Sequence, residues 1–249
     1  MILLLLGGML LAFEGGFRLH RLLSRDLASP DTGTTDESYV LSGVFGLLAL
    51  LMAFALSLAL DRHEQRRSLV VEEANALGTF SSRLALLPPD VRLPLQADLA
   101  RYADLRVSAG RSASMADYER KSAEAEQVHA AIGMRLYAAL GTGPTDTRAP
   151  LLLAPYNSTG DIATARHAAR AAQLPGEVMT LLAAYCLIAA ATLGYTLSGA
   201  GRPHRLASAV LFVLLAFAFT TIVDLDRPRD GFIRVPQSEL AKVAKGLPR

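Results

Sequence analysis

Residues 40–77 read VLSGVFGLLALLMAFALSLALDRHEQRRSLVVEEANAL. The first part, Val40–Leu60, is 21 residues without a charged side chain, and about 20 apolar residues are enough for a helix to cross the hydrocarbon core of a membrane. The charged residues that follow contain no helix breaker, and the first clear stop is Pro88-Pro89. We therefore predict one helix of about 50 residues, about 70 Å long at 1.5 Å per residue, that leaves the membrane and continues into water.

Three further apolar blocks accompany this span. Two of them are joined by a short connector rich in Gly and Pro, which predicts a tight hairpin of helices. The block at the N-terminus lacks the basic start and the cleavage site of a signal peptide, so we expect it to span as well, with three spans as the alternative. The expected transmembrane helices are residues 1–23, 40–60, 178–197 and 206–223.

The polar stretch of residues 61–175 is predicted to form a helical domain. Helical patterns run from Asp90 to about Ala109, from Ala116 to Leu140 and from about Ala149 to Gln173, and no alternating strand pattern appears. The predicted fold class is therefore all-α: four transmembrane helices plus a cytoplasmic helical bundle, reached through the long second helix. Residues 224–249 form the expected cytoplasmic C-terminal segment.

The composition excludes several classes of protein. The chain of 249 residues is 51% hydrophobic and 19% charged, which is more apolar than an average soluble domain. A net charge of +2 gives no dense cationic surface, so no nucleic-acid partner is expected. The single cysteine, Cys186, excludes an intrachain disulfide and any zinc site with several cysteines. No HExxH, GxSxG or Walker motif is present, so we predict no enzyme, no cofactor and no metal site.

The basic residues near the span ends predict the orientation. With four spans, nine of them lie on the side of the N-terminus, the helical domain and the C-terminus, against five on the other side. Lys and Arg are enriched in cytoplasmic loops. We therefore expect a multi-pass protein in a lipid bilayer with both termini in the cytoplasm.

Mixed charges follow the second span and allow two interpretations. They are either a solvated helix end that anchors the span, or a vestibule in which charges ringed around an oligomer axis select ions. The residues concerned are Asp61, Arg62, Glu64, Arg66, Glu72, Glu73 and Asn75.

A second cluster follows the fourth span and is dense in turn formers and charges. Its two carboxylates are expected to cap backbone amides or to pair with Arg62, Arg66 or Arg227. A calcium site needs six or more oxygen ligands and only two are identified, so structural pairing is favoured. The cluster contains Asp224, Asp226, Arg227, Pro228 and Gly231.

Glu14 lies inside the first apolar block. Ionisable residues within a membrane are costly and often functional. The alternative is that Glu14 lies at the interface and extends its carboxylate to water.

Two stretches carry a resemblance to a known family. Residues 54–76, FALSLALDRHEQRRSLVVEEANA, and residues 224–237, DLDRPRDGFIRVPQ, are similar to the signatures of the bestrophin-like domain family of bacterial membrane proteins. A more remote similarity links the chain to bestrophin channels, which are pentameric, four-span and mostly anion-conducting. The chain lacks the two Trp of their Asp-Arg-Trp-Trp-Glu-Ala-Arg segment. The resemblance implies an apolar neck on the second span, formed here by Leu50, Phe54 and Leu58 on the row that begins at Gly46.

The resemblance implies a homo-oligomeric ion channel of the bacterial inner membrane, a pentamer by analogy, that conducts small ions, with anions favoured. Leu50 and Phe54 would form the neck, and Arg62, Arg66 and Glu73 would line the vestibule. Asp224 and Asp226 would tie the C-terminal segment to the long helix. The alternative is a non-conducting scaffold or stress-response module whose cytoplasmic helices, above all Ala116–Leu140, bind a partner. An apolar row on a transmembrane helix is also typical of a lipid-facing or packed surface.

Overall fold

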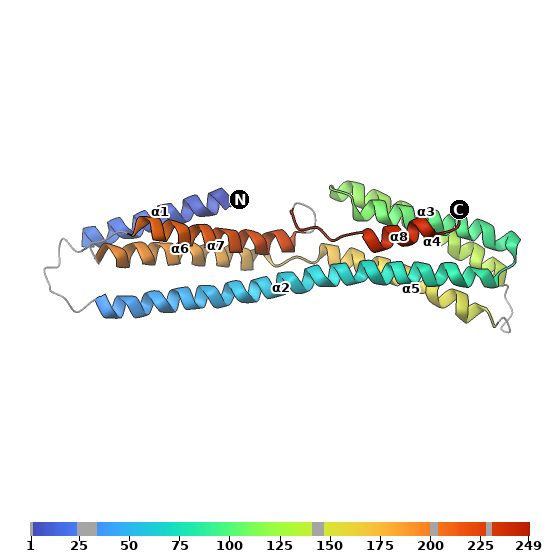
Figure 1. Ribbon diagram of the computed structural model, residues 1–249, viewed down its shortest axis with the longest axis horizontal. Coiled ribbons are helices and arrows are strands. Elements are labelled where there is room, and N and C mark those ends of the chain that lie inside the picture. The colour runs from blue at the N-terminus through green and yellow to red at the C-terminus, as the bar shows by residue number, and fades with distance from the viewer. Residues whose placement is uncertain (1, 24–33, 141–146, 200–203, 228–230) are drawn as a thin grey trace. The chain divides into compact units, whose positions relative to one another are not determined.

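The computed structural model describes residues 2–23, 34–140, 147–199, 204–227 and 231–249, and within them every regular element is a helix. The all-α prediction is thereby confirmed. In chain order (Figure 1) the elements are α1 (Ile2–Leu23), α2 (Thr34–Arg83), a 3-10 turn η1 (Leu84–Leu86), α3 (Pro89–Gly110), α4 (Met115–Leu140), α5 (Ala149–Ala171), α6 (Gly176–Gly199), α7 (Arg205–Asp226) and α8 (Ser238–Gly246).

The long second helix predicted from the sequence is present as α2, which has 50 residues without interruption. It is followed by the 3-10 turn η1 and then by Pro88, which has an extended backbone and is the N-cap of α3. Pro89 occupies the start of α3, where its missing N–H costs no helical hydrogen bond. Asp90, where the helical pattern was expected to begin, therefore lies in the first turn of α3.

Four helical stretches are long and apolar enough to cross a membrane. They lie within Ile2–Leu23, Ser38–Leu86, Ala149–Ser198 and Arg205–Asp226. Each contains one of the four apolar blocks of the sequence.

The chain folds into two units that share α2. Unit 1 comprises Met1–Asp61 and Gln173–Asp226, and unit 2 comprises Arg62–Ala172 and Arg227–Arg249. In unit 1, α1 packs along α6 and also contacts α7, as Figure 1 shows. Its core combines buried side chains from all four of its helices, among them Met9, Phe13, Leu48, Met52, Leu182, Cys186 and Phe212.

Two glycines let α1 and α6 approach closely. A Cβ at Gly16 would collide with the carbonyl of Ala191, and a Cβ at Gly194 would collide with the carbonyl of Phe13. The atoms in the way are backbone atoms, which cannot turn aside as a flexible side chain can. Small residues at such crossings allow the backbone contact on which helix packing in membranes depends.

We expect Gly16→Ala to destabilise unit 1 by about 1–3 kcal/mol, the usual cost of forcing extra atoms into a packed interface. Gly15→Ala is the matched control, because a Cβ there meets nothing within 4 Å and Ala favours a helix more than Gly does. Thermal unfolding of the detergent-purified protein measures both. Equal unfolding midpoints for the two variants would contradict the close approach of α1 and α6.

Unit 2 is built from the rest of α2, η1, α3, α4, α5 and α8. The end of α2 contributes Leu77 and Phe80 to a core that also holds Leu99 and Tyr102 of α3 and Ile132 of α4. The short helix α8, which the sequence did not reveal, contacts α3 and buries Leu240 and Ala244.

Candidate functional site

The predicted neck residues share one exposed face of α2. Leu50, Phe54 and Leu58 are 51%, 61% and 50% exposed, although they are large apolar side chains in the middle of a long helix. Their spacing of four residues keeps them on one side of the helix. The opposite side of α2 is buried in unit 1 through Leu48, Met52, Ala55 and Ala59.

The exposed face continues along α2 into the predicted vestibule residues. Asp61, Glu64, Glu72 and Asn75 are all exposed, at steps that follow the helix repeat from Leu58. Arg62 is half-buried. The exposed part of α2 after Leu58 thus carries three carboxylates, and the exposed Arg67 lies 3.6 Å from the carboxylate of Glu64.

Two predicted vestibule residues, Arg66 and Glu73, lie elsewhere. Arg66 is 6% exposed and Glu73 is fully buried within unit 2. Steps of seven residues, close to two helical turns, separate Ala59, Arg66 and Glu73, so both charged residues continue the buried face of α2. The assignment of Arg66 and Glu73 to an open vestibule is therefore corrected: they belong to the interior of unit 2.

Glu73 is the centre of a buried ion-pair cluster. Arg106 of α3 donates from Nε to Glu73 Oε1 at 2.5 Å, and Arg166 of α5 donates from Nη1 to Glu73 Oε2. The second nitrogen of Arg166, Nη2, donates to Gln237 Oε1 at 2.8 Å. Three segments that are distant in the sequence thus meet at one carboxylate, and Arg166 links them to a fourth through Gln237.

Burial and charge act in opposite directions on the pKa of Glu73. Burial alone raises it, because the charged form loses its hydration. The charges of Arg106 and Arg166 and the hydrogen bonds from both outweigh burial, so the pKa of Glu73 lies below its ordinary value. The pKa of Arg106 is raised: burial acts to lower it, but the attraction of Glu73 outweighs that effect. The cluster is therefore ionised at neutral pH.

Arg66 is fixed by the end of α5. Its Nε donates to the carbonyl of Ala169 at 3.0 Å and its Nη2 to that of Ala172 at 2.7 Å. The last carbonyls of a helix have no partner within the helix and carry partial negative charge, so a cation is stabilised there.

In the second predicted cluster, Asp226 caps a backbone amide. Its Oδ1 accepts a hydrogen bond from the N–H of Leu174 at 2.8 Å, just before α6 begins. This is one of the two roles expected for the pair of carboxylates. Asp224 is half-buried, Arg227 is exposed and Gly231 is buried. Pro228 lies outside the described residues.

Glu14 lies between two arginines of unit 1. Arg18 donates from Nε to its Oε1 at 3.2 Å, and Arg205 of α7 places Nη2 3.6 Å from its Oε2. The side chain of Glu14 is 37% exposed. Glu14 therefore has two cationic partners within unit 1.

The residues described here offer little for metal or thiol chemistry. They contain no group of three or more His, Cys, Asp or Glu side chains that could hold a metal ion. The thiol of Cys186 is fully buried in unit 1. What the chain does arrange is an exposed apolar row on the part of α2 in unit 1 and, in unit 2, a buried cluster of ionised groups around Glu73.

The chain was compared with known protein families, curated proteins and solved structures. The family model of the Bestrophin-like domain matches residues 8–240. No curated protein matches the chain. Among solved structures, a bacterial bestrophin homologue from Klebsiella pneumoniae superposes with a TM-score of 0.69 at 13% identity, covering 98% of this chain and 94% of that chain.

Crystal structures of two single-residue variants of the Klebsiella pneumoniae homologue give a similar result. One has a TM-score of 0.71 at 14% identity, covering 98% of this chain and 96% of the other. The other has a TM-score of 0.72 at 13% identity, covering 98% and 94%. At this identity the superpositions establish the fold. The family match over most of the sequence and the four apolar helices together show that the chain is a membrane protein of the Bestrophin-like domain family.

Proposed function

We propose that this protein is a homo-oligomeric ion channel of the bacterial inner membrane, with the exposed face of α2 turned toward the pore. The observation that carries the proposal is the row of Leu50, Phe54 and Leu58, which a single chain leaves exposed. In a ring of subunits such rows form an apolar constriction, which blocks ions when it dewets and passes them when it is hydrated. The family resemblance suggests five subunits, with both termini in the cytoplasm.

The sign of the conducted ion depends on the charges beyond the neck. The resemblance to bestrophin channels favours anions. The side chains exposed on the same face of α2 favour cations, because Asp61, Glu64 and Glu72 are acidic and rings of carboxylates attract cations. Arg66, which was expected to line the vestibule, is buried, so Arg67, paired with Glu64, is the exposed cation that lies closest to these carboxylates in the sequence. We therefore include cation conduction as a second candidate, carried by this acidic row.

The test is ion flux through the purified protein in liposomes under a potassium or a chloride gradient. A channel dissipates the gradient, and the sign of the reversal potential in planar bilayers identifies the ion. If the acidic row selects for cations, neutralising Asp61 and Glu72 together should move the reversal potential away from the equilibrium potential of the cation. Absence of flux under both gradients would contradict the channel and favour the scaffold. In that case, binding of a partner protein should depend on the surface of α4.

A further inference from the structure

A cavity of about 460 Å³ in unit 2 is lined by α3, α4 and α5. Residues of α4 that line it recur at spacings of three and four and so lie on one face of that helix: Glu119, Ser122, Glu126 and His129. Small side chains of α5, such as Ala163, leave the space open. The volume lies in the range of about 300–1,000 Å³ that is typical of sites for small molecules.

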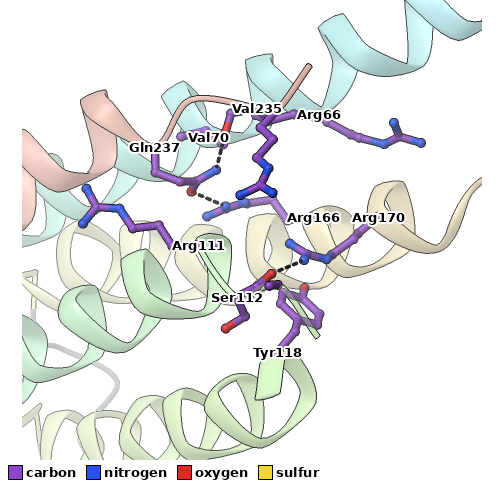
Figure 2. Close-up of a pocket in the computed structure, with 12 residues that line it drawn as sticks. Arg66, Val70, Arg111, Ser112, Tyr118, Arg166, Arg170, Val235 and Gln237 are labelled. Carbon is purple, nitrogen blue, oxygen red and sulfur yellow. Dashed lines mark hydrogen bonds between the residues drawn. The ribbon is translucent and has the colours of Figure 1, made fainter. Parts of the chain in front are cut away.

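A stacked pair of rings forms another part of the wall. Tyr118 and His167 lie with their ring centroids 5.9 Å apart and their planes at 14°. The guanidinium of Arg170 lies 4.2 Å from the ring centroid of Tyr118, and it donates to the carbonyl of Ser112 at 3.1 Å, as Figure 2 shows. Because Tyr118 is held by two neighbours from α5, this part of the cavity is formed before a ligand binds.

Two carboxylates line the cavity without a cation of their own. Glu119 and Glu126 are exposed, and neither makes a hydrogen bond or an ion pair within the described part of the chain. The neighbouring cations of α4, Arg120 and Lys121, pair with Asp117 instead. The two glutamates are seven residues apart, which corresponds to about 10 Å along a helix.

Two basic groups of the wall leave these carboxylates uncompensated. Arg106 lines the cavity, but its Nε donates to the buried Glu73 at 2.5 Å, so its charge is already paired. Burial lowers the pKa of His129 below its ordinary value, so the imidazole is mainly uncharged at neutral pH. The charges of Glu119 and Glu126 therefore remain available to a ligand.

Two wall residues carry hydroxyl groups that lack a partner. The hydroxyls of Ser122 and Tyr102 are buried and have no hydrogen bond to any described residue. Ser122 lies between Glu119 and Glu126 on the same face of α4, and Tyr102 is only 2% exposed. Buried polar groups are costly when they are left unpaired. A bound molecule with N–H groups would supply the missing partner.

We propose that this cavity binds an aliphatic diamine, an organic dication whose two ammonium groups are joined by an apolar chain. The ammonium groups would pair with Glu119 and Glu126, and the apolar chain would lie against Ala123 and Ala163. A hard metal ion such as calcium needs six or more oxygen ligands, and the described residues contain no group of three acidic, His or Cys side chains that could hold a metal. The site is independent of conduction, because binding does not require a pore.

Isothermal titration of the full chain in detergent with 1,5-diaminopentane tests the site. We expect saturable binding that weakens as ionic strength rises, because exposed charges are screened. Pentylamine has the same apolar chain but one ammonium group, and it should bind about fivefold more weakly, the loss expected for one exposed ion pair. Glu119→Gln and Glu126→Gln should each cause a similar loss. Both side chains are exposed, so the variants should fold.

Two further variants test whether the cavity itself holds the ligand. Glu124→Gln makes the same change on α4 at a residue that does not line the cavity, and it should bind as the wild type does. Ala163→Leu fills the cavity without changing a charge, and it should lose saturable binding while the thermal unfolding midpoint stays close to that of the wild type.

Several results would overturn the proposal. They are no saturable binding of diaminopentane, equal binding of pentylamine, unchanged binding by both Glu119→Gln and Glu126→Gln, or an equal loss in Glu124→Gln. Full binding by Ala163→Leu would place the ligand on the surface and contradict the cavity as well.

Discussion

Glu73→Gln is expected to lower the stability of the folded chain by about 3–5 kcal/mol, the cost of removing one partner from a buried ion pair. The carboxylate is fully buried and receives hydrogen bonds from Arg106 and Arg166. Without it, two guanidinium groups keep their charge in an interior that no longer compensates them. The amide keeps the volume of the side chain, so the loss reports the charge.

Thermal unfolding of the detergent-purified protein measures this effect. A loss of this size should lower the midpoint by about 10 °C in a chain of this length. Glu72→Gln is the matched control, because the same change one residue earlier is made on an exposed side chain and should shift stability by less than about 0.5 kcal/mol. Equal midpoints for the two variants would contradict the buried cluster.

The same cluster predicts the direction of the acid response. The pKa of Glu73 in the folded chain lies below its ordinary value of 4.5, so the ion pairs contribute their full stability above that pH. The contribution is lost as the pH falls through the folded-state pKa, because protonation removes the charge. The acid-induced loss of stability should therefore be steeper in the wild type than in Glu73→Gln.

Truncation of the proposed neck should have the second large effect. The double variant Leu50→Ala and Phe54→Ala removes most of the apolar volume from the exposed row of α2, so a constriction there becomes wider and easier to hydrate. We expect at least about a tenfold increase in ion flux, which corresponds to a barrier lower by about 1.4 kcal/mol. Flux in liposomes at equal protein density provides the measurement.

A matched double variant separates the pore from the lipid-facing surface. Leu214 and Phe217 of α7 are 61% and 58% exposed, so Leu214→Ala with Phe217→Ala removes the same atoms from another exposed apolar row. Flux should stay at the wild-type level in this control. An increase of the same size in both double variants would contradict the assignment of the neck to α2.

Most of the fold could be predicted from the sequence because its signals are local. The four apolar blocks and the absence of a breaker before Pro88 determine the helices of unit 1 and the length of α2. The helix α8 was missed because its nine residues carry only a short amphipathic pattern. Its position depends on the burial of Leu240 and Ala244 against α3. Contacts between residues so far apart in the sequence cannot be read from a single sequence.

The candidate site also has features that the sequence predicts and features that it does not. Periodicity along one helix was enough to place Leu50, Phe54 and Leu58 on one face. The same periodicity, at steps of seven residues from Ala59, indicates that Arg66 and Glu73 continue the buried face, but charge suggested a solvated position. Their partners could not be predicted, because Arg106 and Arg166 lie 33 and 93 residues from Glu73.

Cysteine modification is the most direct test of our proposal that the exposed face of α2 lines an ion pathway. Cys186 is the only cysteine and is fully buried, so Cys186→Ser gives a background for Phe54→Cys, with Phe217→Cys as the control. Current through planar bilayers is recorded while a charged, membrane-impermeant methanethiosulfonate reagent is added. We predict that the reagent changes the current of Phe54→Cys irreversibly and leaves that of Phe217→Cys unchanged. Unchanged current in Phe54→Cys, with the thiol shown to be modified, would contradict the claim.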